Sequence, residues 1–164
     1  MSVIVWITES TWPACVDAAR ERAADGDCVL LHVTDDAVPE AAHGAFAGLL
    51  GRGRAERDPG NRLEGLSWAA ADDLLAEAER RLGRPARRLA LHGRPEQQVV
   101  RAVAGPDLLV CARDGDRTRL GPRSLGPATR FVVDHAPCPV LLVWPDAAPG
   151  LDSLPPPPPH HPRP

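Results

Sequence analysis

The amino-acid sequence predicts an α/β fold in which helices cover both faces of a parallel sheet. Four short segments are almost continuously apolar, a pattern typical of strands that are buried on both faces: residues 2–7, 28–33, 108–112 and 140–144. A fifth segment, RLALH at 88–92, alternates leucine with smaller or polar residues and is expected at one edge of the sheet. Because helical patterns separate these strands, each strand–helix–strand unit should be right-handed, with its two strands parallel.

The longest helix is predicted over residues 67–82, where apolar side chains recur at helical spacing. Ser67 is a candidate cap for its start, and Gly83 follows its end. The preceding segment at 51–62 is polar and rich in glycine and arginine, and it is expected to be a flexible loop. The side chains of the helix that should face the sheet are Trp68, Ala71, Leu75, Ala78 and Leu82.

The remaining helices are predicted mainly from their ends. Residues 11–24 begin with Thr11 and have a proline in the first turn, which suits a helix start. Residues 95–104 begin at a proline and end before a Gly-Pro pair, and residues 127–135 form a short last helix. Residues 39–50 carry a weaker helical pattern, because two glycines interrupt it.

Composition indicates one soluble domain followed by a tail. The chain has 164 residues and a net charge of −3, so its charge favours neither nucleic acid nor an anionic membrane as a partner. No apolar run approaches the roughly 20 residues needed to span a bilayer, and no basic region precedes the first apolar run. We therefore expect a cytoplasmic protein with a domain at 1–145 and a disordered proline-rich tail at 146–164.

The sequence indicates neither a metal site nor a catalytic group. The four cysteines form no CxxC pair, and His160 and His161 alone make a weak metal site. All 19 basic residues are arginine, which excludes a Schiff-base lysine, and no serine lies in a G-x-S-x-G motif. Glu9 follows the first strand, where a carboxylate could act on a bound water, but an exposed loop position is the simpler interpretation.

Four segments have distinctive amino-acid sequences: LLHV at 30–33, HGRPEQQVV at 92–100, the DLLV strand with its glycine loop, and HAPCPVLLV at 135–143. Together they resemble the universal stress protein family over residues 3–144. The resemblance implies a five-stranded parallel sheet of order 3-2-1-4-5, of the adenine nucleotide alpha hydrolase-like type. It also implies a homodimer through the last strand. This agrees with the position of that strand, because an apolar strand at the edge of a sheet is normally paired or covered. The residues of this strand are Val140, Leu141, Leu142, Val143 and Trp144.

ATP-binding members of that family carry an aspartate after the first strand and a glycine loop of pattern G-x-x-G-x9-G-[ST]. Here Thr8 stands at the aspartate position, Ala112 or Arg113 at the first glycine, and Pro127 at the last position. Alanine adds a Cβ where backbone must approach a phosphate. Proline removes a backbone N–H and a hydroxyl from the helix start. We therefore expect no resident cofactor, and ATP binding that is weak.

Other parts of the loop pattern are kept. Gly115 and Gly126 match the two later glycines, although ten residues separate them instead of nine. Thr129 offers a hydroxyl near the helix start, and four arginines bring positive charge to the loop, namely Arg113, Arg117, Arg119 and Arg123. The resemblance places a ligand cleft at the carboxyl ends of the strands, with Val33 against an adenine. The candidate cofactor-binding residues are Thr8, Glu9, Val33, Ala112, Arg113, Gly115, Gly126, Pro127 and Thr129.

The expected function is that of a stress-response binding module, regulatory or protective, that is not an enzyme and does not bind ATP tightly. Two alternatives stay open. One is an ATP-binding switch with slow ATP hydrolysis, and the other is a structural dimer that acts through a protein partner. Thermal unfolding with ATP and Mg²⁺ distinguishes the first alternative, because a bound ligand stabilises the folded state.

Overall fold

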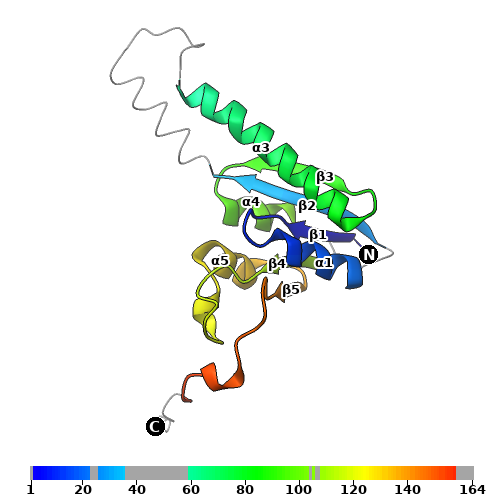
Figure 1. Ribbon diagram of the computed structural model, residues 1–164. Coiled ribbons are helices and arrows are strands. Elements are labelled where there is room, and N and C mark those ends of the chain that lie inside the picture. Colours follow the sequence, from blue (N-terminus) through cyan, green and yellow to red (C-terminus); the bar gives the residue numbers. More distant parts are fainter. Residues whose placement is uncertain (1, 23–25, 36–58, 104, 106–107, 158–164) are drawn as a thin grey trace.

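Five parallel strands form a single sheet of order β3-β2-β1-β4-β5 (Figure 1). The computed structural model describes residues 2–22, 26–35, 59–103, 105 and 108–157, with the backbone alone over 59–63. The strands are β1 (Ser2–Trp6), β2 (Asp27–Thr34), β3 (Arg87–His92), β4 (Leu108–Ala112) and β5 (Val140–Val143). The predicted fold class is confirmed, with the RLALH strand at one edge and the last strand at the other.

The helices lie in two layers, one on each face of the sheet (Figure 1). They are α1 (Trp12–Arg22), α3 (Pro59–Leu82), α4 (Pro95–Ala102) and α5 (Pro127–His135), with 3-10 turns η2 (Pro122–Ser124) and η3 (Leu151–Ser153). The predicted helix at 39–50 lies outside the described residues. Among the described residues, no helix is long and apolar enough to cross a membrane.

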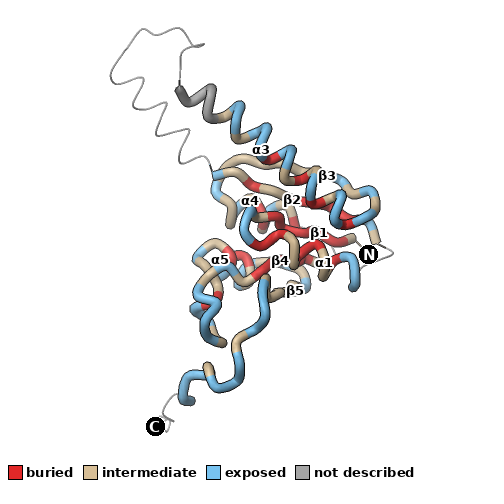
Figure 2. The backbone as a smooth tube through the Cα atoms, in the orientation of Figure 1, coloured by how far each residue is buried: buried red, intermediate tan, exposed pale blue. Residues whose placement is uncertain are grey.

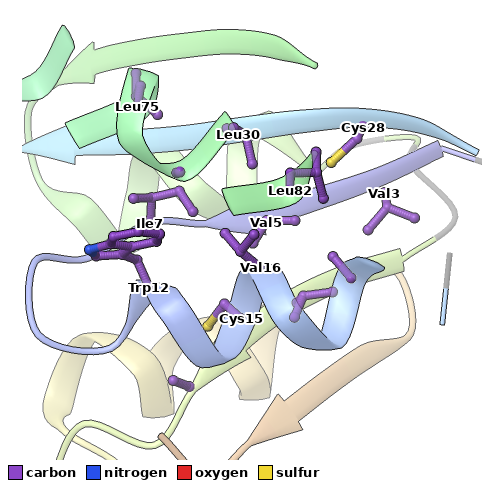
Figure 3. Close-up of a cluster of buried hydrophobic side chains, with 14 residues drawn as sticks. Val3, Val5, Ile7, Trp12, Cys15, Val16, Cys28, Leu30, Leu75 and Leu82 are labelled. Atoms are coloured by element: carbon purple, nitrogen blue, oxygen red, sulfur yellow. The ribbon is translucent and has the colours of Figure 1, made fainter. Parts of the chain in front are cut away.

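Strand β1 supplies the centre of both cores, because successive side chains of a strand point to opposite faces. Val3 and Val5 pack with α1 and α3 (Figure 3), whereas Ile4 and Trp6 pack with α4 and α5. Figure 2 shows the buried residues concentrated along the central strands and the inner sides of the helices. Trp12 is also buried, on the α1 side, so both tryptophans near the start of the chain serve packing.

Helix α3 begins at Pro59, so the predicted start at Ser67 is wrong and the end of the expected loop at 51–62 is helical. Proline is well suited to the first turn of a helix, and each of the two glycines before Ser67 costs only about 1 kcal/mol. The predicted inward position of Trp68 is also wrong. Its side chain is 49% exposed and lies against the ring of His92, with ring centroids 3.9 Å apart. Figure 1 shows this end of α3 reaching past the sheet.

Part of the proline-rich tail has defined structure, because Leu151–Ser153 form the turn η3. Asp146 pairs with Arg117 at 2.9 Å, and the hydroxyl of Ser153 accepts a hydrogen bond from the N–H of Leu120 at 3.1 Å. The expectation of a tail without structure is therefore not met over this turn. Its division from the domain at residue 145 stays a prediction.

Truncation after Pro145 is expected to lower the melting temperature by less than about 3 °C. Among the described residues, the tail is joined to the loop by an exposed ion pair and by the hydrogen bond from the Leu120 N–H to the Ser153 hydroxyl, and such contacts contribute little to stability. Differential scanning calorimetry of the full and truncated chains measures the difference. A larger drop would show that the tail is an integral part of the domain.

Candidate functional site

The candidate site lies where the strand order reverses, between β1 and β4. In open parallel sheets, ligands bind beyond the carboxyl ends of the strands at such a reversal. Thr8 and Glu9 follow β1, and Arg113 and Gly115 follow β4. The sheet thus brings these four predicted residues to the same edge, although more than a hundred residues separate the two segments in sequence.

Thr8 is committed to the start of α1. Its hydroxyl lies 2.5 Å from the hydroxyl of Thr11, and its carbonyl accepts the N–H groups of Thr11 and Trp12 at 3.2 and 3.0 Å. Glu9 is exposed in the turn between them. This turn supplies a neutral hydroxyl pair at the position where the family pattern has a carboxylate.

Val33 and Ala112 are both buried. Val33 is 7% exposed and packs in the core beneath α4 and α5, so it presents little surface to a ligand. Ala112 is the last residue of β4, and no described residue other than glycine has a positive φ. Alanine at this position is therefore an ordinary strand residue without backbone strain. Nearby, the Nδ1–H of His32 donates to the carbonyl of Ile7 at 2.8 Å, which gives that histidine a structural role.

The loop after β4 closes on itself. The N–H of Gly115 donates to the carbonyl of Ser124 at 2.9 Å, and the N–H of Asp116 donates to the carbonyl of Arg123 at 2.8 Å. A Cβ built on Gly115 would lie 2.9 Å from backbone atoms of Ser124 and Leu125, so the two limbs of the loop are in contact. The closure uses backbone donors of the kind that hold phosphates in glycine loops.

Arg113 points into this loop. Its guanidinium donates a short hydrogen bond to the hydroxyl of Ser124, which is fully buried and in turn donates to the carbonyl of Gly121 at 2.6 Å. The guanidinium also lies 4.7 Å from the centre of the Trp144 ring. Arg113 therefore ties the loop to the end of β5. Arg117 also has a partner, because it forms an ion pair with Asp146.

Asp114 occupies the N-terminus of α5. Its Oδ1 accepts the N–H of Gly126 at 2.7 Å, and its Oδ2 accepts the hydroxyl of Thr129 at 2.9 Å. Pro127 is the first residue of the helix and has no N–H to offer. Sequence reasoning missed this role, since a carboxylate twelve residues before the N-cap residue Gly126 has no local capping signature.

Cys111 lies just before the loop, on the buried strand β4. Burial, assisted by the charge of Asp114, raises the pKa of its thiol to about 12. The thiol therefore stays protonated at neutral pH and is a poor nucleophile. Among the described residues, no group of three or more His, Cys, Asp or Glu side chains could hold a metal ion.

Two hollows in the structure lie away from the candidate residues. One, of about 610 Å³, is lined by Ser2, Cys28 and Arg87 at the amino ends of the strands. The other, of about 640 Å³, lies between residues 116–123 and 152–156. Neither is lined by any of the predicted cofactor-binding residues.

The described geometry has clear counterparts among known proteins. The model of the universal stress protein family matches residues 8–143. No curated protein sequence matches the chain. Among solved structures, the hypothetical protein MJ0577 has a TM-score of 0.67 and 17% identity, over 90% of this chain and 97% of that one. These values show a shared fold.

Two further structures of that fold are described with ligands. A universal stress protein in complex with cAMP has a TM-score of 0.59 and 17% identity, over 89% of this chain and 98% of its own. The universal stress protein from Archaeoglobus fulgidus in complex with dAMP has a TM-score of 0.53 and 15% identity, over 87% and 96%.

Proposed function

Because the chain belongs to the universal stress protein family, we propose that it is a cytoplasmic stress-response binding module, regulatory or protective, that does not bind ATP tightly. The observation that carries the proposal is the closed loop after β4. The N–H groups of Gly115 and Asp116 already have backbone partners at 2.9 and 2.8 Å. A phosphate that needed these donors would first have to break the closure, and each hydrogen bond lost without replacement costs about 1–3 kcal/mol.

The β1 side of the candidate site supports the same proposal. Thr8 uses its hydroxyl and its carbonyl to start α1, and it has no carboxylate to offer a ligand. A lost charge-assisted hydrogen bond weakens binding by about 1.5–3 kcal/mol, which is tenfold or more in affinity. Weakened contacts on the β1 side and on the β4 side of the candidate site make tight nucleotide binding unfavourable.

The second candidate function is an ATP-binding switch with slow hydrolysis. The two solved structures in complex with cAMP and dAMP favour it, because those proteins hold adenine nucleotides on the same fold. In this chain Gly115 and Gly126 are kept in the loop. Both glycines have another reason to be present here, since the backbone of the opposite limb leaves no room for a Cβ at Gly115 and the carboxylate of Asp114 lies close against Gly126.

Isothermal titration calorimetry of the unaltered protein with ATP and Mg²⁺ distinguishes the two candidates. We expect no binding with a Kd below about 1 µM, which corresponds to about 8 kcal/mol of binding free energy. Titrations with AMP and cAMP under the same conditions extend the test to the smaller nucleotides. Submicromolar binding of ATP would overturn the proposal in favour of the switch.

Self-association through β5 is the other part of the proposed function. β5 is an apolar edge strand, and such edges are normally paired or covered. The carbonyls of Pro139 and Val143 point to β4, so the backbone groups of Val140 and Leu142 point outward. A second copy can extend the sheet through these groups, related by a two-fold axis.

Light scattering at micromolar concentration is therefore expected to show a homodimer. The variant Leu142→Pro removes one outward N–H while leaving the hydrogen bonds to β4 in place, and it should shift the equilibrium to monomer. Circular dichroism checks that the variant keeps its fold. A monomeric unaltered protein would contradict the prediction.

A further inference from the structure

We propose that the carboxylate of Asp114 is a built-in anion that replaces a ligand phosphate at the N-terminus of α5 and thereby excludes phosphate from the cleft. The inference deepens the proposed function and rests on it, because it names the residue that determines which ligands the cleft rejects. Nothing in the family pattern assigns a role to this position, which lies between its first two glycines.

The geometry of the carboxylate carries the proposal. A helix N-terminus attracts anions through its unpaired N–H groups and its dipole. Asp114 uses both oxygens there, accepting from the Gly126 N–H at 2.7 Å and from the Thr129 hydroxyl at 2.9 Å. Thr129 is only 2% exposed, so its hydroxyl is directed to a specific partner and away from solvent.

The fit of Gly126 to this carboxylate is a second observation. A Cβ built on Gly126 would lie 2.9 and 3.0 Å from the two oxygens of Asp114 and 3.1 Å from its Cγ. The first distance is shorter than real Cβ contacts and the other two are tighter than most, so with a larger residue at this position the carboxylate would have to shift away from the helix start. The loop therefore has room at Gly126 for the carboxylate of Asp114.

Exclusion of phosphate follows from charge and space together. A phosphate entering at Gly126 would compete for the same donors and would meet a negative charge at hydrogen-bond distance, which is repulsive. With Asp114 in place, the ordered loop needs no nucleotide to satisfy the start of α5. This end of the candidate site therefore disfavours anionic ligands.

The variant Asp114→Ala tests the proposal with inorganic phosphate as the probe. Removing the carboxylate leaves the Gly126 N–H and the Thr129 hydroxyl ready for an external anion. Phosphate should then raise the melting temperature of the variant by about 2–4 °C at concentrations several times its Kd. Sodium chloride at the same ionic strength serves as the blank, since it controls for screening.

Asp116→Ala is the matched control, because its carboxylate lies in the same loop but accepts its hydrogen bonds from Thr118 and not from the start of α5. Neither this variant nor the unaltered protein should respond to phosphate beyond the chloride blank. In ¹⁵N–¹H spectra, phosphate should shift the Gly126 amide of Asp114→Ala alone. A phosphate response of equal size in the unaltered protein would overturn the proposal.

Asp114→Asn keeps the test decisive if the alanine variant folds poorly. Asparagine preserves the shape and one acceptor but removes the charge, so phosphate should shift the Gly126 amide in this variant too, though less strongly. Absence of a phosphate-dependent shift in both variants would refute the role of Asp114. Failure of the proposed function is a separate result, because it would appear as tight ATP binding by the unaltered protein in calorimetry.

Discussion

ATP is expected to bind at least about 100-fold more tightly to a chain carrying Thr8→Asp, Ala112→Gly, Pro127→Ser and Asp114→Asn than to the unaltered chain. The first change restores a carboxylate beside the cleft, and the third restores an N–H and a hydroxyl at the start of α5. Each charge-assisted hydrogen bond contributes about 1.5–3 kcal/mol, so two of them give about 3 kcal/mol or more. The Asp114 change removes the competing charge. Calorimetry with ATP and Mg²⁺ measures the gain.

The control carries the same three restoring changes with Asp116→Asn in place of Asp114→Asn. It has the same net charge, but the carboxylate at the start of α5 is still present. Its affinity for ATP should rise by less than about tenfold, a free-energy gain under about 1.4 kcal/mol. Equal affinities of the two quadruple variants would show that Asp114 does not oppose the nucleotide.

Gly115→Ala is expected to lower the free energy of unfolding by about 1–3 kcal/mol. The new Cβ would be pressed against the backbone of the opposite limb, at 2.9 Å from Ser124 and Leu125 and closer still to the carbonyl of Arg123. Backbone cannot move aside as the end of a flexible side chain can. The hydrogen bonds that close the loop must therefore lengthen or break. Urea denaturation followed by tryptophan fluorescence measures the loss.

Gly65→Ala is the matched control, with the opposite sign. Gly65 lies in helix α3, where a Cβ would meet nothing within 4 Å. Alanine in such a helical position stabilises a protein by about 0.4–1 kcal/mol, chiefly by restricting the unfolded chain. If both substitutions stabilised the protein, the contact between the two limbs of the loop would be refuted.

The sheet could be predicted from the sequence because the pattern that marks each strand lies within that strand. The apolar runs that became β1, β2 and β4 are largely buried, the apolar run of β5 lies half-buried at one edge, and the alternating pattern of RLALH matches the other edge. The start of α3 was misplaced because the overhanging turns have no core to face, so no apolar periodicity marks them. Trp68 follows the helical spacing, but its ring lies against His92 at the end of β3 and stays half exposed.

The candidate site was predicted less completely, for a different reason. The positions of Thr8, Arg113 and Gly115 at one edge of the sheet follow from strand order alone. The partners of Arg113 and Asp114 depend on how a long loop folds back, and no spacing rule relates them. Counting the charges of the loop could not show that one arginine is turned inward.

The contact of Gly115 with the protein's own backbone has a consequence for how function is read from such sequences. Substitution at Gly115 is penalised by folding itself, because a Cβ there would press on the backbone of Arg123, Ser124 and Leu125 whether or not a nucleotide ever binds. Loss of a ligand would therefore not release this position from its role in folding. A loop glycine of this kind is then no evidence of nucleotide binding, whereas the residues Thr8 and Pro127 determine which groups the site offers to a ligand.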